Sequence, residues 1–125
     1  MYIYKYIQEN YLYLNYIPYL NRNIWRDINM TSRKEIEKIL KKNKSYLKKK
    51  YHVEKIGIFG SYARGQEYND SDVDILVTFS DSIGWEFIDL QEYLQEILGL
   101  TVDLVTIKAL KPQLRDSILN EVVYA

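Results

Sequence analysis

The sequence predicts an α/β (α+β) domain in which helices pack against a small mixed β-sheet. Two observations support this fold class. Across residues 31–125, segments with helical spacing alternate with strand-like apolar runs, and capping residues, glycines or a proline bound them. The hydrophobic fraction of 47% is enough for one core, and 125 residues is the size of one domain.

The first part of this pattern is a helix, a strand and a short helix. A helix is predicted over residues 32–50, because Ser32 and Glu35 form a capping box and apolar residues then follow at helical spacing. A strand is predicted over 53–59, where apolar residues predominate. The short helix over 61–64 follows directly and is expected to stop at a glycine.

The second part of the pattern supplies the rest of the sheet and its cover. It predicts a strand over residues 72–79, a long helix over 82–98 and a further strand over 101–107. A last helix is expected from residue 112, where a proline suits the first turn, and a short edge strand over 122–124. The long helix is expected to bury its apolar residues, which are Trp85, Ile88, Leu90, Leu94, Ile97 and Leu98. Any exposed part of its aromatic residues would instead offer a surface to a partner.

Residues 1–29 differ in composition from the rest of the chain. Seven of the 13 tyrosines lie between Tyr2 and Tyr19. We therefore divide the chain into a tyrosine-rich N-terminal extension, residues 1–29, and a domain, residues 30–125. Met30 stands directly before the first helix-start signal. The extension is thus either the product of an over-extended reading frame, with Met30 as the natural start, or an apolar arm that docks on a partner.

Charge and cysteine content narrow the possible classes of function. The net charge is zero, but residues 30–55 carry +7 and residues 56–125 carry −8. The basic segment is either a solvated helix face or a surface for phosphates or an acidic partner, and the acidic half can recruit cations. The absence of cysteine excludes disulfides and thiol chemistry and fits the cytoplasm. No apolar stretch approaches the roughly 20 residues of a membrane span, so we expect no membrane partner.

Three carboxylates are the first candidate site residues. Strand alternation points Asp72 and Asp74 to one face, and Asp103 has the parity to join them if its strand is a neighbour. Adjacent carboxylates repel, and a divalent cation relieves the repulsion. Mg²⁺ prefers such oxygens, and two Mg²⁺ ions can hold the attacking and leaving oxygens of a phosphoryl displacement. We therefore predict that all three are catalytic metal ligands, with Asp103 also accepting the proton of the attacking hydroxyl.

Gly60 and Ser61, which ten intervening residues separate from Asp72, form the second candidate motif. Gly60 permits a close backbone approach, and Ser61 stands at the start of a short helix, where N–H groups favour phosphate. Arg64 lies one helical turn further on and can add a cation. Taken alone, the motif also fits an ordinary strand-to-helix turn. With the carboxylates downstream, it predicts a phosphate-binding site made of Gly60, Ser61 and Arg64.

The segments Gly60-Ser61-Tyr62-Ala63-Arg64-Gly65 and Ser71-Asp72-Val73-Asp74-Ile75-Leu76-Val77 together resemble the signature of the polymerase β-type nucleotidyltransferases. More narrowly, they resemble the minimal nucleotidyltransferase (MNT) family over about residues 31–125. The resemblance implies the polymerase β-like nucleotidyltransferase fold, a triphosphate at Gly60 and Ser61, metals at the three aspartates, and pyrophosphate as the leaving group. MNT proteins are often antitoxins of HEPN ribonuclease toxins, and members of that kind are similar to enzymes that transfer AMP to a toxin tyrosine.

The resemblance therefore implies Mg²⁺-dependent transfer of AMP from ATP to a protein hydroxyl, with a HEPN toxin as partner and no direct binding of nucleic acid. Two alternatives remain open. The domain could neutralise a toxin by masking it without catalysis, or it could modify a small molecule such as an aminoglycoside. Tyr62 and Tyr68 flank the motifs, where they could stack on a base, accept AMP in self-modification, or simply pack.

Overall fold

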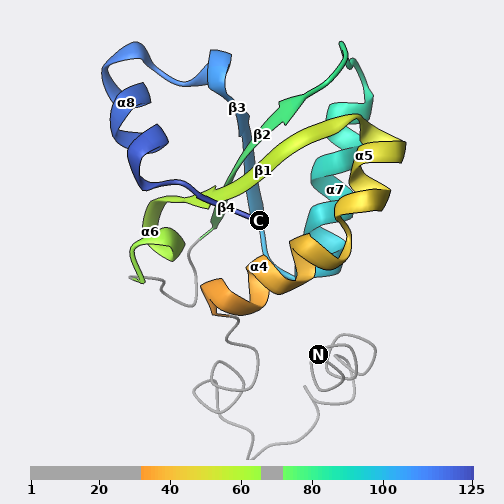
Figure 1. The fold of residues 1–125 in the computed structure, drawn as a ribbon, viewed down its shortest axis with the longest axis horizontal. Coiled ribbons are helices and arrows are strands. Elements are labelled where there is room, and N and C mark those ends of the chain that lie inside the picture. The colour runs from red at the N-terminus through yellow and green to blue at the C-terminus, as the bar shows by residue number, and fades with distance from the viewer. Residues whose placement is uncertain (1–31, 66–71) are drawn as a thin grey trace, which may run out of the picture. The chain divides into compact units, whose positions relative to one another are not determined.

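The computed structural model describes residues 32–65 and 72–125. In this part of the chain the helices and the 3₁₀ helix η1 surround a four-stranded mixed sheet (Figure 1). The elements in chain order are α4 (Arg33–Lys42), α5 (Lys44–Tyr51), β1 (Val53–Phe59), α6 (Gly60–Ala63), β2 (Val73–Phe79), α7 (Glu86–Leu98), β3 (Val102–Thr106), η1 (Ile107–Ala109), α8 (Pro112–Glu121) and β4 (Val123–Tyr124). The predicted fold class is confirmed. The predicted extension over residues 1–29 lies outside the described residues.

The strand order β3-β2-β1-β4 makes the sheet mixed. β1 pairs antiparallel with both β2 and β4, whereas β2 and β3 run parallel. A parallel pair needs a crossover, which α7 provides between β2 and β3. The end of β1 and the starts of β2 and β3 consequently meet at one edge of the sheet.

Helices cover both faces of the sheet (Figure 1). On one face, α4, α5 and α7 pack over the main core, whose members on β2 are the alternate residues Val73, Ile75 and Val77. On the opposite face, α8 packs over a smaller cluster around Phe59, Leu76 and Leu110. Alternation puts Asp74 and Leu76 on this second face. The face is therefore apolar where α8 covers it and acidic near its edge.

The first helix is two helices, so the prediction of one helix to Lys50 was wrong. The break lies at Asn43, between α4 and α5. The Asn43 side chain donates to the Ile39 carbonyl at 2.8 Å and accepts from the Tyr93 hydroxyl at 3.0 Å. A side chain that bonds its own backbone ends a helix, and here a distant tyrosine holds it in place. The predicted N-cap is confirmed, because Ser32 Oγ accepts from the Glu35 N–H at 3.3 Å.

The long helix also differs from its prediction. It begins at Glu86 rather than Ser82, and its buried side is formed by Leu90, Leu94 and Leu98. Trp85 is 82% exposed and Ile88 48% exposed, so the prediction that both are core residues was wrong. Residue 88 lies about 200° around the helix axis from residue 90, which turns it away from the sheet.

None of the helices in the described ranges has the length and apolar character that crossing a bilayer requires.

Candidate active site

The sheet brings two of the predicted carboxylates side by side. In the parallel register of β2 and β3, Asp74 is the partner of Asp103. The condition for Asp103 to join the other carboxylates, that its strand is a neighbour of β2, is therefore met. Asp72 immediately precedes β2, and it and Asp103 are exposed, whereas Asp74 is half-buried. Strand pairing therefore places Asp74 beside Asp103, and Asp72 lies one residue before the start of β2.

The surroundings of Asp74 disfavour its charged form. Burial, followed by the like charges of Asp103 and Asp72 and a hydrogen bond with Asp103, raises the pKa of Asp74 to about 6, and the nearby Arg64 charge opposes this rise. Such repulsion is relieved by a shared proton or by a cation. Carboxylate oxygens are the donors that a hard divalent ion prefers, so the chemistry of the donor set fits Mg²⁺. Within residues 32–65 and 72–125, no group of three His, Cys, Asp or Glu side chains is placed as a ready ligand set for a metal ion. Water and phosphate oxygens would therefore complete the shell of a bound Mg²⁺.

Gly60 joins the two sequence motifs physically. It follows β1 directly, and the last residue of that strand, Phe59, is the cross-strand partner of Asp74. Gly60 has a φ of 72°, a conformation that residues with a Cβ rarely adopt. A Cβ on residue 60 would also collide with the Asp74 carboxylate. Two separate reasons therefore favour glycine at position 60: its positive φ, and the lack of space for a Cβ beside the Asp74 carboxylate.

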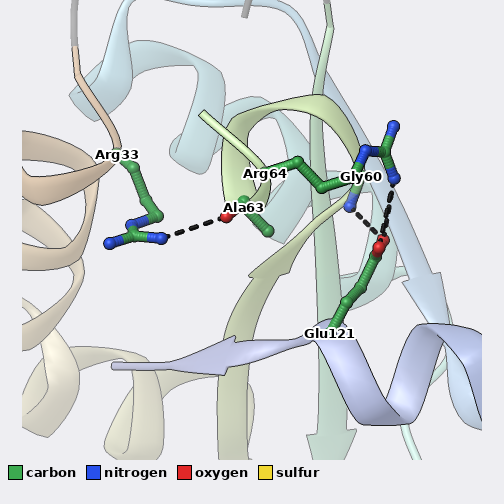
Figure 2. A network of polar contacts seen from close by, with 5 residues as sticks. All are labelled: Arg33, Gly60, Ala63, Arg64 and Glu121. Atoms are coloured by element: carbon green, nitrogen blue, oxygen red, sulfur yellow. Dashed lines mark hydrogen bonds and ion pairs between the residues drawn. The ribbon is translucent and has the colours of Figure 1, made fainter. Parts of the chain in front are cut away.

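The turn after β1 is held from both sides (Figure 2). Glu121, the last residue of α8, accepts a hydrogen bond from the Gly60 N–H at 2.7 Å and forms an ion pair with Arg64 at 3.1 Å. On the other side, Arg33 Nη1 donates to the Ala63 carbonyl at 3.0 Å. Sequence reasoning missed Glu121 and Arg33, because they lie 61 and 30 residues from their backbone partners and no local pattern marks them.

The remaining predicted residues lie around this turn. Ser61 is half-buried in α6, and Arg64, just after α6, is exposed. Tyr62 is 3% exposed and belongs to the main core, which favours the packing alternative over contact with a base. Tyr68 lies outside the described residues.

Residues 34–125 match the profile of the nucleotidyltransferase domain family. The chain belongs to this family. The nucleotidyltransferase is 48% identical over 96 residues to the protein adenylyltransferase MntA of Thermococcus cleftensis, and the alignment covers 76% of this chain and 97% of that protein. The similarity over almost the whole relative identifies the nucleotidyltransferase as one of the minimal type.

Two solved structures share the fold of this nucleotidyltransferase. One, assigned as a minimal nucleotidyltransferase, superposes with a TM-score of 0.65 at 29% identity and covers 74% of this chain and 95% of its own. The other is a toxin–antitoxin complex with AMP-PNP, with a TM-score of 0.54 at 25% identity, covering 75% of this chain and 72% of its own. The described sheet and helices are therefore those of the polymerase β-like nucleotidyltransferase fold.

Proposed function

We propose that this nucleotidyltransferase moves AMP from ATP to a tyrosine hydroxyl of a HEPN-type toxin in a Mg²⁺-dependent reaction, and so acts as its antitoxin. The observation that carries the proposal is the contact between the two motifs. Gly60 packs against the carboxylate of Asp74, which is paired with Asp103. A phosphate-compatible turn and an acidic pair thus share one edge of the sheet.

The three aspartates have separate tasks in this proposal. Asp72, Asp74 and Asp103 would hold two Mg²⁺ ions. Burial, and after it the like charges of Asp103 and Asp72, raises the pKa of Asp74, and a bound cation would offset both effects, which supports a role in cation binding. When bound, Mg²⁺ would supply charge neutralisation for the phosphates and for the oxygens that attack and leave. Asp103, which is exposed at the edge of the pair, accepts the proton of the acceptor hydroxyl.

The triphosphate would lie along the turn after β1. Ser61 contributes its hydroxyl and Arg64 its cation, while Gly60 lets the turn approach Asp74 closely. Attack by the tyrosine oxygen on the α-phosphorus forms the new ester bond and breaks the bond to pyrophosphate, which leaves. ATP as the nucleotide is supported by the toxin–antitoxin structure that holds AMP-PNP.

A protein acceptor is supported by the relatives. MntA of T. cleftensis is a protein adenylyltransferase, and the fold is shared with one component of a toxin–antitoxin complex. The test is incubation of the chain with labelled ATP, Mg²⁺ and the HEPN protein that it neutralises. Wild type is expected to label the HEPN protein, and Asp74→Asn is not.

Asp116→Asn is the matched control, because Asp116 is an exposed carboxylate on α8 that the proposal does not use. It should label the HEPN protein as wild type does. If wild type and Asp74→Asn leave the partner equally unlabelled, transfer to this partner is refuted.

A second candidate function is neutralisation by masking, without catalysis. The observation that favours it is the exposure of Trp85 and Ile88 near the start of α7, where apolar side chains are available to a partner. Toxin neutralisation that is undiminished in an Asp72→Asn/Asp74→Asn double variant would favour masking over transfer.

A further inference from the structure

One carboxylate from the C-terminal helix holds two groups of the candidate site. Glu121 accepts from the Gly60 N–H and pairs with the Arg64 guanidinium, as Figure 2 shows. We propose that Glu121 is a positioning residue for the nucleotide: it keeps the turn closed against Asp74 and holds Arg64 at the triphosphate. This inference rests on the proposed function.

The anchoring of α8 makes Glu121 a rigid support. Ile118 and Leu119 of α8 pack on the cluster formed by Phe59, Leu76 and Leu110, which lies on the same face of the sheet as Asp74. Glu121 closes α8 a few residues later, with 24% of its side chain exposed. Because Glu121 stands on an anchored helix, its carboxylate can hold the long Arg64 side chain with little further loss of conformational entropy at Glu121 itself.

The two contacts act on different kinds of group. Gly60 offers a backbone N–H at 2.7 Å, so this bond fixes the path of the turn beside Asp74. Arg64 is a long side chain that is 50% exposed, and its Nη1 lies 3.1 and 3.3 Å from the two Glu121 oxygens. A guanidinium carries five N–H donors in a planar fork, so the ion pair with Glu121 orients the group and is compatible with a phosphate contact.

The chain of contacts runs from Asp74 through Gly60 and Glu121 to Arg64. A change at Glu121 should therefore act on nucleotide binding through two separable routes. Glutamine keeps an oxygen that can accept from the Gly60 N–H and loses the charge that holds Arg64. Alanine removes both contacts.

The test measures the Kd of ATP in the presence of Mg²⁺ by calorimetry, together with KM for ATP and kcat. Glu121→Gln is expected to raise Kd and KM about three- to tenfold, the effect of one lost charge-assisted contact, with kcat nearly unchanged. Glu121→Ala is expected to raise them further. Asp116→Asn, the exposed carboxylate five residues earlier on α8, should bind ATP as wild type does.

A double-variant comparison separates positioning from general damage to the fold. If Glu121 acts through Arg64, Glu121→Gln has no further effect on Kd in an Arg64→Ala background. Equal Kd values for wild type and Glu121→Gln would overturn the proposal, as would tighter binding by Glu121→Gln, which would mean that the carboxylate competes with the triphosphate. Should Glu121→Ala fail to fold, the glutamine variant and its Arg64→Ala background carry the test.

The outcomes also distinguish this inference from the proposed function. If wild type binds ATP but labels no HEPN protein, the transfer proposal fails, and the Kd comparison still decides the role of Glu121. If wild type labels the partner and Glu121→Gln binds ATP as wild type does, only the positioning role fails.

Discussion

Replacement of Gly60 by alanine is the perturbation that probes the contact between the two motifs. The φ of 72° at this position costs a residue with a Cβ about 1–2 kcal/mol. The new methyl group would also displace the Asp74 carboxylate. A misplacement of about 1 Å in a reacting geometry can cost on the order of 100-fold in rate, so we expect a loss of AMP transfer of this size.

Gly65→Ala is the matched control for this experiment. Gly65 has a φ of 68°, and no atom of the described residues lies within 4 Å of the position that a Cβ would take there. Gly65→Ala should lose about 1–2 kcal/mol of stability and Gly60→Ala at least as much, and each kcal/mol lowers Tm by about 4–8 °C in a domain of this size. Only Gly60→Ala should lose transfer, measured as the initial rate of labelling of the HEPN protein. Equal transfer rates in the two variants would refute the reasoning.

The acidic pair and the core carry three further predictions. With Mg²⁺ at about 100 times its Kd, wild type should gain about 2.7 kcal/mol in thermal unfolding, and Asp74→Asn clearly less. When a chelator keeps Mg²⁺ away, the pKa of about 6 at Asp74 lies above its ordinary value of 3.8, so Asp74 binds its proton more tightly in the folded than in the unfolded state. This stabilisation is present below about pH 4 and is lost as the pH rises through 6. Asp74→Asn should therefore match wild type at pH 4 and be about 1 kcal/mol more stable at pH 8 in urea unfolding, a value reduced for the solvent exposure of Asp74. Leu90→Ala, at a fully buried position, should cost about 2–5 kcal/mol, and Trp85→Ala, at a position 82% exposed, less than about 0.5 kcal/mol.

The strands and the faces on which the aspartates lie could be predicted because their signals are local, whereas the pairing of β2 with β3 that brings Asp74 and Asp103 together was only a condition. Alternation along β2 fixes the face of Asp74, and the same alternation along β3 gives Asp103 its matching parity. The capping box at Ser32 likewise depends on residues three apart. Each of these signals lies within a few residues of the feature that it predicts.

The features that the sequence did not reveal depend on partners far along the chain. Asn43 divides the first helix while bonded to Tyr93, 50 residues away, and Glu121 reaches Arg64 across 57 residues. The apolar character of Trp85 predicts a core position, but the direction in which its side chain points depends on where α7 begins. Hydrophobicity alone does not encode that boundary.

The most direct test of the central claim is the intact mass of the HEPN protein after incubation with ATP, Mg²⁺ and this nucleotidyltransferase. We predict a mass increase of one or more AMP groups, mapped to tyrosine by peptide analysis, and no increase with Asp74→Asn. An unmodified HEPN protein with wild type, or equal modification by Asp74→Asn, would contradict the account.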